Sequence, residues 1–95
     1  MAKYVFSFRG RPDRATTAEE EAAWGRWFEE IGSSIADFGN RVGKAQVVGT
    51  GPSADTLTGY VVVNAESLEA ATALAGGCPG IRQGGGVEVG ATVES

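Results

Sequence analysis

The spacing of hydrophobic positions changes several times along the chain, and each spacing predicts one element of structure. Four stretches are rich in β-branched or aromatic residues, often at every second position, as in half-buried strands. In the first of them Tyr4, Phe6 and Phe8 share one face. Short turns are expected at residues 11–14 and 51–55. The strands that we expect are residues 3–10, 44–50, 56–64 and 86–93.

Residues 16–40 instead carry apolar side chains at the spacing of a helix. Thr17 precedes Glu20 by three residues, which is the spacing of a capping box, and acidic residues in the first turn suit the helix dipole. Gly39 and Asn40 are typical of a helix end. This stretch predicts one long helix with an apolar stripe formed by Trp24, Trp27, Phe28, Ile31, Ile35 and Phe38.

A second, shorter helix and a glycine-rich connection are expected before the last strand. The helix covers residues 67–75, and its first residue is a serine that can act as N-cap. Gly76 or Gly77 is expected to end it in a left-handed conformation, and Pro79 prevents its continuation. The connection, residues 76–86, leads from a helix into a strand. A phosphate-binding loop has the opposite direction, so we do not expect phosphate binding here.

The order strand, helix, strand, strand, helix, strand predicts a single α+β domain over residues 1–95, a ferredoxin-like βαββαβ sandwich. Both helices would lie on one face of a four-stranded antiparallel sheet. Glycine recurs every seven residues on the first helix, at Gly25, Gly32 and Gly39. Each interior glycine costs a helix about 1 kcal/mol relative to alanine. We therefore expect these glycines to let the two helices approach closely.

The sheet face that the helices leave uncovered is also predicted to be apolar. In the third strand, Leu57, Val61 and Val63 point one way. Tyr60 and Val62 point the other way. A large exposed apolar patch is unusual on a monomer, and helices cover only one face of such a sheet. We therefore expect a homodimer that packs two sheet faces together.

Charge and composition exclude several classes of function. The formal net charge is −4, which disfavours nucleic acids and anionic membrane surfaces because both attract basic proteins. The chain has no histidine, the side chain that most often binds metals and transfers protons near neutral pH. A single cysteine rules out an internal disulfide and suits a cytoplasmic protein. No apolar run is long enough to span a bilayer, and no metal or cofactor motif is expected.

Two later stretches resemble a known family. Residues 59–79, GYVVVNAESLEAATALAGGCP, and residues 84–93, GGGVEVGATV, are similar to the YCII-related family and its DGPF-type branch. Residues 35–43, IADFGNRVG, resemble a helix end that is common in that family. The resemblance covers most of the chain from about residue 24 onward. It implies a small dimeric α+β barrel protein, in which two ferredoxin-like protomers pack through their sheets.

The chain departs from this family at the positions that would carry chemistry. Some members resemble lactone isomerases and have a histidine on the first helix paired with an aspartate, proposed as a catalytic dyad. Here residues such as Trp24 and Trp27 occupy the helix where that histidine is expected. The DGPF signature is also broken, because Thr50 replaces its aspartate and Ser53 its phenylalanine. The resemblance therefore implies no reaction for this chain.

Three residues are candidates for ligand binding. Arg9 forms a cluster with Arg11 and Arg14, and guanidinium groups hold carboxylates or phosphates through paired hydrogen bonds. The alternative for this cluster is a solvated turn. Trp24 offers an aromatic wall for a cavity, or packs in the core like the rest of its stripe. Tyr60 has a hydroxyl that would orient a ligand, or lie at the rim of an interface.

Three further side chains carry reactive groups. Asp37, near the predicted end of the first helix, is the one candidate for a general base, and a salt bridge to Arg41 is the alternative. The catalytic residues are otherwise unassigned. Cys78 follows a helix C-terminus, which raises the pKa of a thiol, so an inert structural role is expected. Glu88 alternates away from the valine face and needs a partner if a dimer buries it.

Two functions stay open on this basis. The first is a small homodimeric protein that binds a small polar or anionic metabolite in a pocket between helix and sheet. The second is a non-catalytic interaction or regulatory module whose activity is self-association. The absence of histidine and of a cofactor motif favours the second function. The barrel cavity that the resemblance implies favours the first, and whether the protein is an enzyme stays open.

Overall fold

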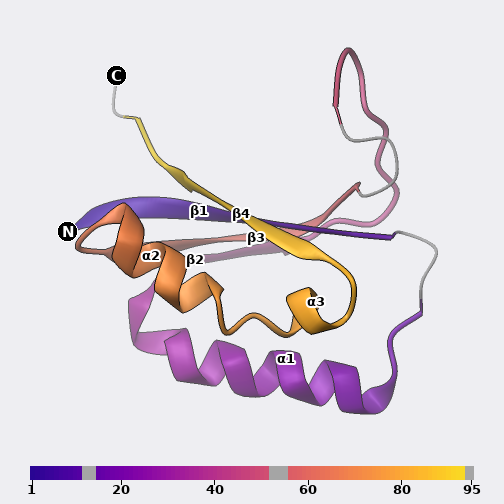
Figure 1. The fold of residues 1–95 in the computed structure, drawn as a ribbon, viewed down its shortest axis with the longest axis horizontal. Helices are drawn as coiled ribbons and strands as arrows, with labels where there is room; N and C mark the ends of the chain where they lie inside the picture. The colour runs from indigo at the N-terminus through magenta and orange to yellow at the C-terminus, as the bar shows by residue number, and fades with distance from the viewer. Residues whose placement is uncertain (12–14, 52–55, 94–95) are drawn as a thin grey trace.

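An antiparallel sheet forms one layer of the protein, and the helices form the other (Figure 1). The computed structural model describes residues 1–11, 15–51 and 56–93. The α+β class and the βαββαβ order are confirmed, and the strand order β2-β3-β1-β4 is compatible with a ferredoxin-like fold. None of the helices in these three ranges has the length and apolarity needed to cross a membrane. The elements are β1 Ala2–Gly10, α1 Ala18–Ile31, β2 Ile35–Arg41, β3 Thr56–Ala65, α2 Leu68–Ala75, α3 Pro79–Arg82 and β4 Gly86–Ala91.

The centre of the core lies between β1, β3 and the helices. Tyr4, Phe6 and Phe8 of β1 point toward the helices and are at most 6% exposed. Val63 and Val61 of β3 lie opposite the first two of them and are almost completely buried. The alternation expected for these two strands is therefore confirmed in the core. The turns expected at 11–14 and 51–55, with Arg14 and Ser53, lie largely outside the described residues.

The first helix is shorter than predicted. It begins with the expected capping box: Thr17 Oγ1 accepts a hydrogen bond from the Glu20 amide at 3.1 Å, and the Glu20 carboxylate accepts from the Thr17 amide at 2.9 Å. It ends at Ile31, and one 3-10 turn over Gly32–Ser34 follows. Glycine and serine are poor helix residues, and the residues after them, 35–41, pair with β3 instead of continuing the helix.

The strand β2 replaces the strand that was predicted at residues 44–50, where no regular element forms. It lies at the edge of the sheet and ends with Arg41 opposite Gly59 of β3, after two register shifts. Within it Gly39 has a φ of 62°, and a Cβ there would collide with the Tyr60 carbonyl. The glycine that was expected to end a helix therefore bends an edge strand.

The glycines of the first helix do not bring two helices together. A Cβ built at Gly25 or Gly32 would meet nothing within 4 Å, and the third glycine lies in β2. Phe38, which was predicted for the apolar stripe, is 67% exposed. The stripe ends instead within the helix, where Trp27 and Ile31 are buried. The predicted close approach of helices through these glycines is therefore wrong.

The segment from α2 to β4 contains an unpredicted short helix, α3. Ser67 caps α2 as expected, since its hydroxyl accepts from the Ala70 amide at 3.0 Å. The left-handed cap predicted at Gly76 or Gly77 is wrong, because Gly76 has a right-handed φ of −60° and Gly77 does not have a positive φ either. Pro79 does stop α2, but it also begins α3, where its missing amide hydrogen breaks no helical bond. The left-handed residue of this segment is Gly84, with a φ of 87°, after α3.

None of the helices in the described part of the chain lies on the other face of the sheet (Figure 1). Near its centre Val5 lies opposite Val62, and Ser7 lies opposite Tyr60. All four are partly buried within the single chain. A bulge after Phe8 interrupts the alternation that was expected to continue to the start of β3. This face therefore mixes polar and apolar side chains, with a small apolar centre.

Candidate functional site

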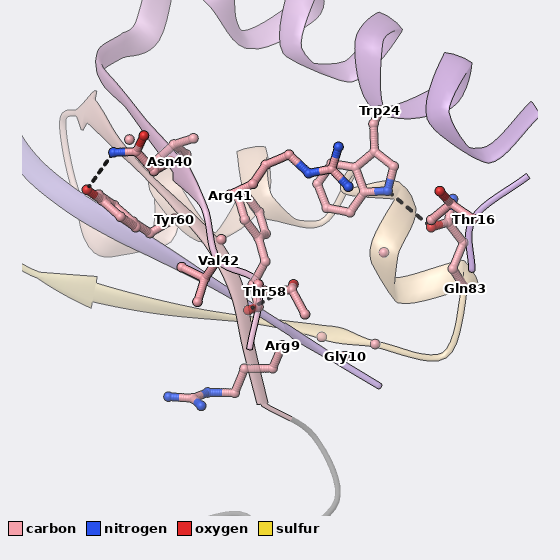
Figure 2. A pocket seen from close by; sticks show the side chains of 18 of the residues that line it. Arg9, Gly10, Thr16, Trp24, Asn40, Arg41, Val42, Thr58, Tyr60 and Gln83 are labelled. Carbon is pink, nitrogen blue, oxygen red and sulfur yellow. Dashed lines mark hydrogen bonds between the residues drawn. The ribbon is translucent and has the colours of Figure 1, made fainter. Parts of the chain in front are cut away.

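A broad groove of about 1040 Å³ opens at the end of the sheet where β1 and β2 finish and β3 begins. Helix α1 contributes residues to one side, and the end of β2 with the residues after it, 38–44, contributes to another. The turn around α3 supplies a third part of the lining. The groove thus brings together segments that are far apart in the sequence (Figure 2).

A glycine in β3 keeps the sheet closely packed beside the groove. Gly59 is buried, and a Cβ there would lie 3.2 Å from the Asn40 carbonyl oxygen and 3.7 Å from the Phe8 ring. A side chain would push β2 away from β3. The glycine therefore helps to place the end of β2, including Arg41, against the groove.

Trp24 gives the groove an aromatic surface that is held from several sides. Its indole Nε1 donates to Gln83 Oε1 at 3.1 Å. Its ring packs edge-to-face on Phe8, with centroids 5.1 Å apart, and lies 5.9 Å from the Phe28 ring. A Cβ at Gly80 would be 3.0 Å from Trp24 Cζ2, so the backbone of α3 packs directly against the indole. The ring is thus fixed before any ligand arrives.

The groove is more basic than the chain as a whole. Among the residues that the structure describes, the lining holds four Lys or Arg residues and one acidic residue, Glu21. A chain with a net charge of −4 therefore concentrates positive charge at this place, which favours anions. The four cations are Arg9, Arg11, Arg41 and Lys44.

Arg41 is the cation whose side chain is directed toward the tryptophan. It lies opposite Gly59, and Figure 2 shows its side chain extending from β2 toward Trp24. Its guanidinium has no ion pair or hydrogen bond with any residue that the structure describes. The sequence predicts Arg41 only as a salt-bridge partner for Asp37, because Arg41 directly follows the helix that was expected over residues 16–40. Had residues 35–41 been predicted as a strand, Arg41 would have been expected at the end of the sheet, beside the groove.

Arg9 and Tyr60 line the same groove, but their side chains do not converge on Trp24 (Figure 2). Arg9 Nε lies 3.5 Å from Glu88 Oε1, so the glutamate has a partner on the open face of the sheet. This pair is exposed and adds little stability. The Tyr60 hydroxyl accepts a hydrogen bond from Asn40 Nδ2 at 3.3 Å. The three predicted ligand residues therefore border one cavity from two sides of the sheet.

Asp37 is not among the residues that line the groove. Its Oδ1 accepts from the Gly39 amide at 2.8 Å and stabilises the bend in β2. No ion pair joins it to Arg41 in the described part of the chain, so the predicted salt bridge is not formed. The same ranges contain no group of three Cys, Asp or Glu side chains arranged to hold a metal ion.

Cys78 lies between α2 and α3 and is 2% exposed. Burial raises the pKa of its thiol to about 11, although hydrogen bonds from the backbone at Gly80 and Ile81 lower it in part. The thiol is therefore protonated at neutral pH and unreactive, in line with the expected structural role. The cause is desolvation, and the helix C-terminus invoked from the sequence is not needed.

Comparisons with known proteins identify no relative of this chain. No protein-family model matches it. A search of the curated proteins finds no significant match either. The resemblance to the YCII-related family stays a prediction from the motifs, and function has to be inferred from the groove and the sheet.

Proposed function

We propose that the protein binds a small anionic molecule with a flat apolar body in the groove between α1 and the end of β2. The observation that carries this proposal is the combination, in one cavity, of a pre-positioned indole at Trp24 and an unpaired guanidinium at Arg41, as far as the structure describes the chain. Ligand pockets typically combine apolar walls with a few polar groups. An arginine pairs well with a carboxylate because its fork of donors matches the two oxygens.

The proposal is one of binding, with no reaction assigned. Glu21 is the only carboxylate in the described lining, and its Oε1 already accepts a hydrogen bond from Thr16 at 3.1 Å. The chain has no histidine to pair with it. We therefore propose that a polar or anionic metabolite is held by charge and by stacking on the indole. We further propose that the protein is of the YCII-related type and acts in the cytoplasm.

We also propose a homodimer formed through the open face of the sheet. The pair Val5 and Val62 lies at the centre of that face, and no helix covers it. Self-association without a ligand is the alternative function, and the same face favours it. Val62→Asp is expected to give a sedimentation mass of one chain, while the unmodified protein gives two. A mass of one chain for the unmodified protein at micromolar concentration would contradict the dimer.

Ligand binding is tested by calorimetric titration with 1-naphthoate, benzoate and inorganic phosphate. Arg41→Gln removes the charge and leaves a shorter polar side chain, and we expect it to weaken naphthoate binding about tenfold or more, as for the loss of a charge-assisted hydrogen bond. Arg82→Gln is the matched control, because Arg82 is exposed on α3 and does not line the groove. Equal affinity of both variants, or no binding by any probe, would contradict the proposal. Tight binding of phosphate alone would show that the indole plays no part.

A further inference from the structure

The side-chain amide of Gln83 has one half that the fold does not use. The indole Nε1 of Trp24 can only donate a hydrogen bond, so the atom that it meets at 3.1 Å must be the carbonyl oxygen of Gln83. This contact fixes the amide orientation and leaves the NH₂ group at the other end. That group has no hydrogen-bond partner among the residues that the structure describes. Since Gln83 lines the groove, its NH₂ group is available to a ligand there.

The backbone around Gln83 holds this amide in a defined place. The Gln83 and Gly85 amides both donate to the Gly80 carbonyl, at 3.1 Å and 2.8 Å. A Cβ at Gly85 would lie 2.5 Å from the Arg9 carbonyl oxygen, so the turn after α3 packs closely on the end of β1. The side chain that reaches Trp24 therefore starts from a turn tied to the sheet.

Two donors of different character flank the same indole. Figure 2 shows Gln83 at one side of Trp24, while Arg41 reaches toward it from β2. Arg41 is charged and suits an anionic group, whereas the Gln83 amide is neutral and suits a carbonyl oxygen. A third polar group nearby, the Thr16 hydroxyl, already donates to Glu21. The groove therefore offers a charged donor and a neutral donor beside the same aromatic ring.

We infer that Gln83 is a specificity-determining residue, whose NH₂ group selects anionic ligands that carry a neutral carbonyl oxygen on the side of the ring away from the charge. This inference rests on the proposed binding function. A ligand without that oxygen would cover the amide and leave it without water or another partner. Sites built to donate a hydrogen bond reject analogues that lack the acceptor for this reason. The ligand class is thus an aromatic or similarly flat carboxylate with a second, uncharged oxygen.

The test compares benzoate with its 3-acetyl and 4-acetyl derivatives, by calorimetric titration of the full chain. We expect the better acetyl isomer to bind about fivefold more tightly than benzoate, the gain typical of one neutral hydrogen bond. In Gln83→Glu an oxygen still accepts from Trp24, but the NH₂ donor is gone. The ratio of the affinity for the acetyl derivative to that for benzoate should then fall to one or below, even if the new charge weakens the binding of both. Gln83→Met, which keeps the length without either polar atom, should abolish the preference too, and Arg82→Gln should keep it.

The outcomes separate this inference from the proposed function. Benzoate binding that depends on Arg41, with no preference for either acetyl isomer, would overturn the role of Gln83 and leave the proposed function standing. A preference that persists in both Gln83→Glu and Gln83→Met would overturn it as well. If neither benzoate nor its acetyl derivatives bind while 1-naphthoate does, the role of Gln83 fails and the proposed function stands. If 1-naphthoate does not bind either, both fail.

Discussion

The two tryptophans of α1 lie three residues apart and differ sharply in their surroundings. Trp27 is 3% exposed and stacks at 6.3 Å from Phe6 in the core. Its Nε1 donates to the Leu74 carbonyl oxygen at 3.3 Å, and a Cβ at Gly77 would lie 3.3 Å from the same nitrogen. A backbone carbonyl and a glycine thus close the space around this indole.

Trp24 also has a hydrogen-bond acceptor and a glycine contact, but its ring is less buried than that of Trp27. Its Nε1 donates to Gln83, which follows α3, and its ring also lies against a glycine, Gly80. Its acceptor is the side chain of Gln83, however, and its ring is only partly buried beside the groove. The same residue type on the same helix becomes core in one case and part of the groove wall in the other. The difference arises from what a segment about 50 residues later places opposite each ring.

The largest expected effect is a difference in the free energy of unfolding between alanine variants of the two tryptophans. Trp27→Ala should lower the free energy of unfolding by about 3–5 kcal/mol, because it leaves a cavity in the core. Trp24→Ala should cost roughly half as much, since part of its ring already contacts water. Urea unfolding followed by circular dichroism measures both. Equal losses for the two variants would show that Trp24 is an ordinary core residue.

Alanine substitutions of the two glycines that contact the tryptophans should reduce stability in the same order as the tryptophan variants. Gly77→Ala should destabilise the protein by about 1–2 kcal/mol, since the buried Trp27 has no room to move. Gly80→Ala should lower stability less, because Trp24 can tilt into the groove, but it should weaken naphthoate binding. Thermal unfolding and calorimetric titration of each variant give the two numbers. A larger stability loss for Gly80→Ala than for Gly77→Ala would reverse the comparison.

Cys78 provides a smaller, pH-dependent test, since it lies in the sequence between Gly77 and Gly80, the glycines that contact the two indoles. Burial raises the pKa of its thiol from 9.0 to about 11, so the folded state favours the protonated form. The contribution is complete below pH 9 and is lost as the pH rises from about 9 to 11, by on the order of 1 kcal/mol near pH 10. Cys78→Ala should remove this part of the decline in stability. Identical declines for both proteins would mean that the thiol contacts water.

Local signals predicted the starts of both helices and the core strands. The caps at Thr17 and Ser67 and the alternation in β1 involve neighbours in the sequence. The end of α1 could not be found in this way, because Ile35 and Phe38 continue the helical period. Pairing with β3, a contact between distant segments, decides that these residues form a strand.

The candidate site was predictable to a similar degree. Trp24 was predicted for the groove because aromatic side chains often line ligand cavities, with core packing as the alternative. Arg41 was missed because it was assigned to a helix end, and Gln83 because its role depends on an acceptor contact with Trp24. Arg9 and Tyr60 line the groove but approach it from the other side of the sheet. Residue type alone could suggest the groove, but long-range pairing determines which side chains meet in it.

The central claim is that the groove beside Trp24 binds small aromatic anions. The chain has two tryptophans, so a ¹⁵N-labelled sample gives two indole N–H signals, which Trp24→Phe assigns. During titration with 1-naphthoate, we predict that the Trp24 signal shifts in a saturable manner while the Trp27 signal stays in place. If neither signal moves, or if both move equally, the groove is not the binding site and the account is contradicted.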